Sequence, residues 1–183
     1  MNIKEEFLKR FPIPKGNKKY PYIILFDAYT GMGKSTVAKE IAKNDDSIIL
    51  NNDEVRDFLN DYQDSSNLKK ELQNYRLELL LKNNNSCICD SCFCHKWEEK
   101  IKYYQSLGYK YYIIRIICSE DVVKERLSKR VKDENNYSIA GFNDYLWMKE
   151  NVKHVDENLI DYTINTEEDV EKQVKEFLKI IDK

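Results

Sequence analysis

Short apolar runs alternate along the chain with longer segments whose apolar residues recur at helical spacing. The apolar runs have the length and composition of buried strands; they lie at residues 20–28, 47–50, 86–89, 109–118 and 161–165. The helical patterns lie at residues 34–43, 53–59, 67–82, 97–107, 120–130, 142–152 and 167–181. Strands that alternate with helices predict a parallel sheet covered on both faces. We therefore expect an α/β fold: a three-layer sandwich with a central, mostly parallel five-stranded sheet.

The N-terminal segment precedes this alternation. Residues 2–10 have the pattern of a short amphipathic helix, and a stretch that contains proline and glycine follows it. We expect residues 1–19 to form an N-terminal appendage and residues 20–183 to form one domain. A chain of 183 residues is long enough for one such domain with a proper core.

Composition narrows the class of protein. Hydrophobic residues make up 42% and charged residues 34% of the chain, which is typical of globular proteins and excludes disordered and membrane classes. No apolar stretch approaches the roughly 18 residues of a membrane span, and the N-terminus has no signal-like core. We expect a cytoplasmic protein without a membrane partner, and the sequence indicates no protein partner. The net charge of −2 supplies no global attraction to nucleic acid, although a local basic strip can supply one.

The segment FDAYTGMGKST, residues 26–36, lies between an expected strand and an expected helix. Successive backbone N–H groups of such a loop surround a β-phosphate, which favours glycine at positions 31 and 33. Lys34 would reach the β- and γ-phosphates of ATP, and the Ser35 hydroxyl would bind Mg²⁺. Ala28 stands where this kind of loop normally has its first glycine, and alanine fits there if its φ is negative. The expected ATP-binding residues are Thr30, Gly31, Met32, Gly33, Lys34, Ser35 and Thr36.

Acidic residues follow two expected strands. Asp53 comes after the second strand, where it is expected to be the N-cap of a helix that places Arg56 on the same face. A carboxylate at this edge of the sheet could take the proton of an acceptor hydroxyl, and Arg56 could hold a phosphate or carboxylate of the acceptor. A cap with a surface ion pair would give the same pattern. Asp90 is the second strand-end acid.

Two arginines mark an expected lid near residues 126–140. Arg126 and Arg130 are four residues apart, which would place them on one face of a helix. Small phosphoryl-transfer enzymes use such a lid to exclude water and to contact the nucleotide, so Arg126 is expected to contact ATP; a solvated helix face is the alternative. His95 and His154 have no local partners and do not indicate a histidine-based nucleophilic site.

Four cysteines crowd into SCICDSCFC as Cys87, Cys89, Cys92 and Cys94. Zinc sites favour C-x2-C pairs on tight turns, whereas the first two cysteines fall in an expected strand. Packing as small apolar residues is therefore favoured over metal binding, which stays open as the alternative.

The segments FDAYTGMGKSTVAKEIA, IILNNDEVRDFL, SCICDSCF, ERLSKR and DYTINTEEDVEKQVKEFL resemble, in order and spacing, the polynucleotide 5′-hydroxyl kinase-like branch of the small AAA-type P-loop kinases. The resemblance covers about residues 20–183 and implies a P-loop NTPase fold of the nucleotide-kinase type. It implies that Asp53 is the general base toward a 5′-hydroxyl, that Arg56 and Asp90 serve the acceptor, and that Arg130 contacts the transferred phosphate. The segment after Asp90 departs from the family pattern, with His95, Lys96 and Lys100 in place of its usual residues.

The leading hypothesis is an ATP-dependent, Mg²⁺-requiring phosphotransferase that acts on the 5′-hydroxyl of a polynucleotide, with Lys34, Asp53 and Arg130 as catalytic residues. A second hypothesis keeps this chemistry and changes the acceptor to a small metabolite, as in nucleoside monophosphate, adenylylsulfate or nucleotide-sugar kinases. A third is a non-catalytic nucleotide-binding module whose cysteine segment serves a metal or a partner. The related kinases share a fold, and fold analogy does not select among these acceptors.

Overall fold

The computed structural model describes residues 2–60, 65–130 and 140–181. Its five strands are β1 (Tyr22–Asp27), β2 (Ile48–Asn51), β3 (Cys87–Asp90), β4 (Lys110–Ile117) and β5 (Tyr162–Asn165). They form one sheet in the order β2-β3-β1-β4-β5, and every pairing is parallel. The expected central sheet is therefore confirmed, with all of its described strands parallel.

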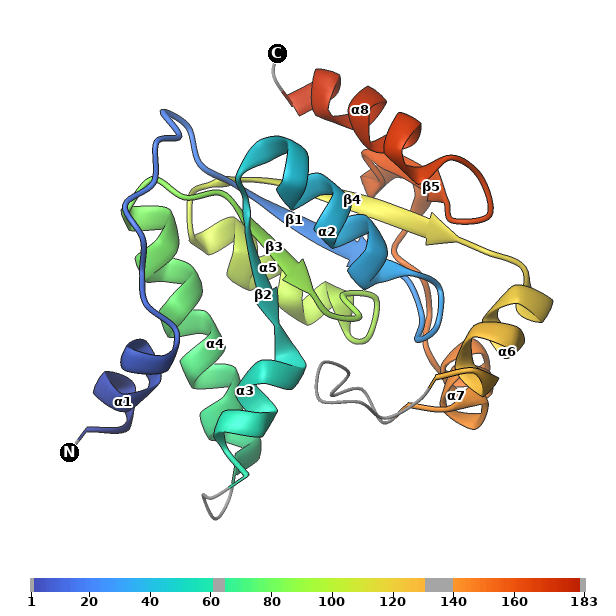
Figure 1. Ribbon diagram of the computed structural model, residues 1–183, viewed down its shortest axis with the longest axis horizontal. Helices are drawn as coiled ribbons and strands as arrows, with labels where there is room; N and C mark the ends of the chain where they lie inside the picture. Colours follow the sequence, from blue (N-terminus) through green and yellow to red (C-terminus); the bar gives the residue numbers. More distant parts are fainter. Residues whose placement is uncertain (1, 61–64, 131–139, 182–183) are drawn as a thin grey trace.

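Helices cover both faces of this sheet (Figure 1). They are α1 (Ile3–Arg10), α2 (Lys34–Asp45), α3 (Asn52–Phe58), α4 (Ser65–Lys82), α5 (Trp97–Ser106), α6 (Glu120–Ser128), α7 (Phe142–Asn151), the 3₁₀ turn η1 (Glu157–Leu159) and α8 (Val170–Ile181). Right-handed crossovers place α2 on one face and α5 on the other, and α8 packs against α2. This arrangement is the expected three-layer sandwich. None of the helices in the described ranges is long and apolar enough to span a membrane.

The core is centred on β1, the middle strand. All six of its residues are buried, because a parallel strand between two neighbours, with helices on both faces, has no side that faces water. The phosphate loop (residues 28–36) follows the end of this strand, and its last three residues are the first residues of α2. The loop is therefore held between two well-packed elements.

The N-terminal segment lies against α3 and α4. A second apolar cluster joins α1 to these helices; its buried members are Phe7, Phe11, Val55, Leu59 and Leu72. Farther along the segment, the Asn85 side chain donates a hydrogen bond of 2.9 Å to the carbonyl oxygen of Pro14. The segment that we expected to be an N-terminal appendage thus packs against α3, the helix that carries Asp53.

Two local expectations are wrong. Asn51, rather than Asp53, is the N-cap of α3, because the Asn51 side chain accepts a hydrogen bond of 2.8 Å from the Asp53 N–H. The helix with Arg126 ends at Ser128, with Lys129 as its C-cap, so Arg130 is not on the same helix. Most of the lid expected near residues 126–140 lies outside the described residues, which omit 131–139.

Candidate functional site

A pocket of about 970 Å³ opens where the strands end, between the start of α2, the start of α3 and the α6–α7 side. Parallel strands carry their carboxyl ends to one edge of the sheet, and ligands of open α/β sheets bind at that edge. The expected site residues that line the pocket are Thr30, Gly31, Gly33, Lys34, Ser35, Thr36, Asp53, Arg56, Asp90, Arg126 and Arg130. Met32 is the exception: its side chain is buried, and its Sδ accepts a hydrogen bond from the Tyr29 N–H.

Two glycines shape the phosphate loop. Gly31 has a φ of +79° and Gly33 a φ of +100°, a region that side chains with a Cβ rarely adopt. A Cβ on Gly31 would lie 2.9 Å from Leu127, and a Cβ on Gly33 would lie 3.0 Å from Thr166. Ala28 is fully buried and is not among the described non-glycine residues with positive φ, so alanine fits at the loop's first position.

The start of α2 is suited to an anion. Gly33 is its N-cap, and its first turn has no acidic residue, whereas α3, α5 and α6 each have two. The positive end of the α2 dipole is therefore not offset by a carboxylate of its own first turn. The Lys34 ammonium group adds a full charge beside it and donates a hydrogen bond of 2.7 Å to the carbonyl oxygen of Tyr29. Loop amides, dipole and lysine together make this a place suited to an anion such as a phosphate group.

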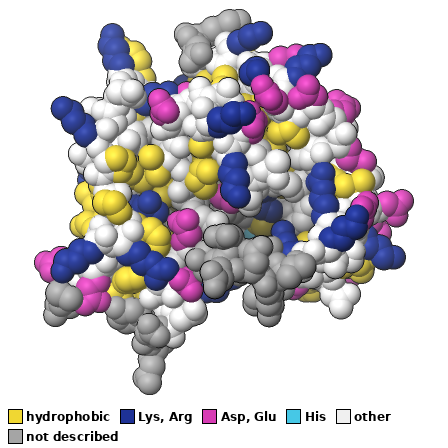
Figure 2. Space-filling model, in the orientation of Figure 1, with side chains coloured by type: hydrophobic (Ala, Val, Ile, Leu, Met, Phe, Trp, Pro, Cys, Tyr) yellow, Lys and Arg dark blue, Asp and Glu magenta, His cyan; other side chains and the backbone are white. Residues whose placement is uncertain are grey.

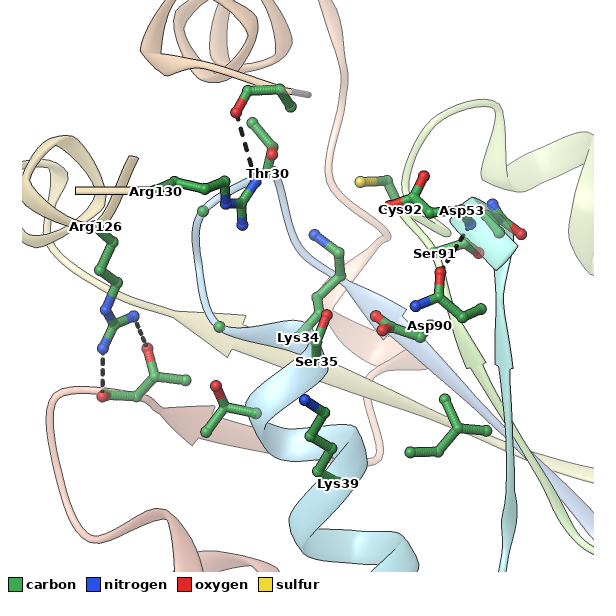
Figure 3. A pocket seen from close by; sticks show the side chains of 18 of the residues that line it. Thr30, Lys34, Ser35, Lys39, Asp53, Asp90, Ser91, Cys92, Arg126 and Arg130 are labelled. Atoms are coloured by element: carbon green, nitrogen blue, oxygen red, sulfur yellow. Dashed lines mark hydrogen bonds between the residues drawn. The ribbon is translucent and has the colours of Figure 1, made fainter. Parts of the chain in front are cut away.

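The acidic side of the pocket is built by β2, β3 and α3. Asn51 and Asp90 are register partners at the ends of adjacent strands, and Figure 3 shows Asp90 beside Ser35, with Asp53 farther from the loop. Burial raises the pKa of Asp90, while contact with the Ser35 hydroxyl and the charge of Lys34 oppose part of that rise. Asp90 therefore lies against the phosphate loop rather than at the far end of the pocket.

Asp53 and Arg56 share one face of α3, as expected from their spacing. Their side chains form an ion pair of 2.9 Å between an Arg56 nitrogen and an Asp53 oxygen. The Arg56 side chain is 48% exposed, so this contact alone is worth little stability. Both side chains remain on the pocket wall, where a ligand can reach them.

The two arginines approach the loop from the side opposite Asp53 (Figure 3). Arg126 donates two hydrogen bonds of 2.9 Å to Thr166, one to the side-chain oxygen and one to the carbonyl oxygen. The Thr166 hydroxyl in turn donates to the carbonyl oxygen of Met32 at 2.9 Å. Arg126 is thus held against the phosphate loop through the residue that follows β5. Arg130 donates to the carbonyl oxygen of Ala140 at 3.5 Å.

Sequence reasoning missed several residues of the pocket wall, among them Lys39, Asn52, Ser91, Cys92 and Thr166. Lys39 lies on α2 four residues after Ser35, so helical spacing could have identified it. The residues after β3 and β5 could have been found from their place at strand ends.

Asp27, at the end of β1, is fully buried and forms hydrogen bonds with residues that are distant in the sequence. No local sequence pattern indicated these contacts. Its oxygens lie 2.8 Å from Nε of Arg115 and 2.8 Å from Nδ1 of His154. Burial by itself would raise the pKa of Asp27, but hydrogen bonds from His154 and Arg115 outweigh it, and the pKa is lowered. The His154 ring also stacks on Tyr29 with 4.3 Å between centroids. His154, which has no local partner in the sequence, thus links the phosphate loop to the chain after α7.

The cysteines pack as small apolar residues. Cys87, Cys89 and Cys94 are buried in the main core, and Cys92 packs at its edge and lines the pocket. Burial raises the pKa of Cys94 to about 12, which keeps its thiol protonated. Among the described residues, no group of three or more His, Cys, Asp or Glu side chains could hold a metal ion.

Solved kinases share this fold. The APS kinase of Mycobacterium tuberculosis, solved with AMPPNP and APS, is 14% identical over 90% of this chain and 99% of its own, with a TM-score of 0.61. A gluconokinase from Sinorhizobium meliloti 1021 (13% identity, 87% and 90% coverage) and the shikimate kinase of Bacteroides thetaiotaomicron (13%, 90% and 99%) each have a TM-score of 0.56. Identities this low show a common fold, that of the P-loop kinases.

No curated protein matches the sequence of this chain significantly. The narrower resemblance to polynucleotide 5′-hydroxyl kinases is not confirmed by these comparisons. Residues 24–155, most of the chain, match the family model described as an AAA domain. The chain therefore belongs to this AAA domain family.

Proposed function

We propose that the protein is an ATP-dependent, Mg²⁺-requiring phosphotransferase whose acceptor is a hydroxyl group of a small anionic metabolite. One observation carries the proposal: a single pocket has the phosphate loop with Lys34 on one side and the Asp53–Arg56 pair on the other. The side of the pocket with Lys34 suits a nucleoside triphosphate, and the side with the Asp53–Arg56 pair suits an acceptor.

The nucleotide would be held mainly by the loop. Backbone N–H groups at the start of α2 and the Lys34 ammonium group would bind the β- and γ-phosphates. Arg126, fixed by its two bonds to Thr166, would contact the nucleotide from the other side without having to be ordered on binding. Prior ordering of this kind lowers the entropic cost of binding.

The residues present fit a magnesium ion. The Ser35 hydroxyl and the Asp90 carboxylate are hard oxygen donors that contact each other at the phosphate loop, and Mg²⁺ prefers such donors. Ser35 and Asp90 would hold the ion, which would neutralise charge on the ATP phosphates. In this proposal Asp90 serves the nucleotide side of the pocket.

Asp53 would take the proton of the acceptor hydroxyl. As that proton moves to the carboxylate, the hydroxyl oxygen forms a bond to the γ-phosphorus. The bond from the γ-phosphorus to the bridging oxygen breaks, and ADP leaves with that electron pair. Lys34 and Arg130 would stabilise the negative charge on the transferring group, and Arg56 would hold an anionic group of the acceptor.

Two observations favour a small acceptor over a polynucleotide. Among the described residues on the face in Figure 2, Lys and Arg side chains are scattered among Asp and Glu and form no continuous basic stripe of the kind that binds a phosphate backbone. The similar structures described above are kinases named for APS, gluconate or shikimate. Each of these compounds carries an anionic group as well as hydroxyls.

A labelling assay tests the proposal. Purified protein would be incubated with γ-labelled ATP, Mg²⁺ and, separately, gluconate, shikimate, APS or a 5′-hydroxyl oligonucleotide. We expect label on a small acid with the wild type and with Lys43→Met, an exposed lysine of the same helix, but not with Lys34→Met. Label on the oligonucleotide alone would show that the acceptor is a polynucleotide. ATP binding without transfer to any hydroxyl of a cell metabolite extract would indicate a non-catalytic module.

A further inference from the structure

A second hollow, of about 400 Å³, opens beside the main pocket. Its wall consists of Asn52, Ser91, Cys92, His95, Lys100, Trp147 and Met148. Four of these, Asn52, Ser91, Cys92 and Met148, also line the main pocket, so the two spaces adjoin. The hollow (below, the side hollow) therefore extends the pocket on the β3–α3 side, where the acceptor would lie.

Lys100 is a half-buried cation that has no acid partner among the described residues. Its Nζ, on α5, donates hydrogen bonds to the carbonyl oxygens of Cys92 at 2.9 Å and Phe93 at 3.4 Å. No carboxylate of the described residues forms an ion pair with it. Burial lowers the pKa of Lys100, since desolvation disfavours the charged form. A ligand anion would supply the countercharge that the described part of the chain does not place there.

Trp147 gives the side hollow a flat apolar wall. It lies on α7 and is 55% exposed, whereas Tyr145 on the same helix is buried. A large indole surface left exposed at the rim of a pocket is suited to a planar or cyclic ligand. Met148, next in sequence, joins the two spaces and adds an adaptable apolar contact.

We propose that the side hollow binds the non-reacting end of the acceptor: its anionic group on Lys100 and its ring against Trp147. The acceptor is then a cyclic hydroxy acid or a ring compound with a phosphate ester, and its free hydroxyl points toward Asp53. This inference rests on the proposed function, because it assumes that an acceptor occupies the β3–α3 side of the pocket. It assigns Lys100 and Trp147 as specificity-determining residues.

The chain offers a direct binding signal. It has two tryptophans: Trp97, which is only 7% exposed, and the exposed Trp147. Trp97→Phe therefore leaves Trp147 as the single indole reporter. In this background, with AMPPNP and Mg²⁺ at saturation, tryptophan fluorescence would be titrated with matched probes. Shikimate and its methyl ester test a carboxylate; AMP and adenosine test a phosphate ester. Each pair keeps the ring and its free hydroxyls while changing the anionic group.

We expect the charged member of at least one pair to quench Trp147 and to bind about 10-fold more tightly than the neutral member, the effect of one charge-assisted contact. Lys100→Met should abolish this preference, Lys100→Arg should keep most of it, and Lys102→Met, an exposed lysine of the same helix, should leave it unchanged. Unchanged AMPPNP affinity in each variant would show that the fold is intact.

Three results would overturn the inference: no quenching by any charged probe, equal affinity for charged and neutral probes, or equal effects of Lys100→Met and Lys102→Met. Because binding is measured without phosphate transfer, failure of this inference can be distinguished from failure of the proposed function. A protein that binds charged probes through Lys100 but transfers no phosphate refutes the proposed function alone. Transfer that is indifferent to Lys100 refutes the inference alone.

Discussion

A single functional residue can lower the stability of the fold, and Asp90 is an example. Its carboxylate is partly buried at the end of β3, and burial raises its pKa above the ordinary value. An acid whose pKa is higher in the folded than in the unfolded protein destabilises the fold as the pH rises above the unfolded pKa, and the full cost is present above the folded pKa. We propose that this cost is tolerated because Asp90, together with Ser35, holds Mg²⁺. Acids with shifted pKa values are common at functional sites.

Replacing Asp90 with Asn should therefore raise stability while it lowers activity. At neutral pH we expect a higher Tm, because the ionised carboxylate is gone, and phosphate transfer that is about 10–100-fold slower with a higher Mg²⁺ requirement. Thermal unfolding and a Mg²⁺ titration measure the two effects, with the exposed Asp121→Asn as the control. A lower Tm with an unchanged Mg²⁺ requirement would contradict this account of Asp90.

Single residues were predictable where their partners are close in sequence. The spacing of three between Asp53 and Arg56 indicated their shared helix face, and the structure has that ion pair. The cap of α3 was misassigned because both Asn51 and Asp53 are good capping residues, and only the backbone conformation decides between them. The contact between Asp27 and His154 spans 127 residues and leaves no local signal.

At the scale of elements, the phosphate loop depends on glycine at position 33. Gly33→Ala should lower the free energy of unfolding by about 1–2 kcal/mol, the cost of a left-handed conformation with a Cβ. It should also weaken ATP binding, because the new methyl group would press on Thr166 at 3.0 Å and shift the loop. Denaturant unfolding and nucleotide titration measure the two quantities.

Gly108 provides a matched control for this prediction. It also has a positive φ, of +73°, but an added Cβ would meet nothing within 4 Å. Gly108→Ala should therefore cost a similar free energy of unfolding and leave ATP affinity unchanged. Equal loss of ATP affinity in both variants would mean that the effect on binding comes from general destabilisation.

The packing of α1 against α3 predicts a long-range dependence. Phe7→Ala should lower the free energy of unfolding by about 3–5 kcal/mol, because Phe7 is fully buried and its loss leaves a cavity in the apolar cluster that it shares with Val55 of α3. Urea unfolding would measure this, with the exposed Glu5→Ala as the control. A change below about 1 kcal/mol would show that α1 is not part of the stable fold.

Elements were predictable where a pattern has a clear end. The five strands were found because each is a short apolar run bounded by polar residues. The end of α6 was missed because the sequence continues with Lys, Arg and Val and has no glycine or proline to stop the helix. The order of the strands across the sheet, β2-β3-β1-β4-β5, is decided by tertiary packing. The periodicity of the sequence carries no information about it.

At the scale of the whole molecule, Asp27 joins parts that are far apart in the chain. It connects the end of β1 with Arg115 on β4 and with His154 after α7, and Tyr29 of the phosphate loop donates a hydrogen bond of 2.7 Å to the carbonyl oxygen of Val152. Loop, sheet and the end of α7 thus form one connected unit.

This network predicts a specific dependence of stability on pH. The folded pKa of Asp27 is lowered, so its contribution is fully present above the unfolded pKa of about 3.9 and is lost as the pH falls through the lower folded value. Asp27→Asn should cost about 3 kcal/mol near neutral pH, as breaking a buried ion pair does, and less as the pH falls below about 3.9. Urea unfolding of both proteins across this range measures the difference, and a constant difference would argue against the linkage.

In the proposed function, one pocket binds ATP at the phosphate loop and transfers its γ-phosphate to a hydroxyl at Asp53. The most direct test compares wild type, Asp53→Asn and Asp57→Asn in single-turnover transfer from γ-labelled ATP to the small acid found by the labelling assay. Asp57 lies on the same helix but does not line the pocket. We predict that Asp53→Asn binds ATP normally and transfers about 10²–10⁴-fold more slowly, while Asp57→Asn stays near wild type. Transfer at a near-normal rate by Asp53→Asn would contradict the claim.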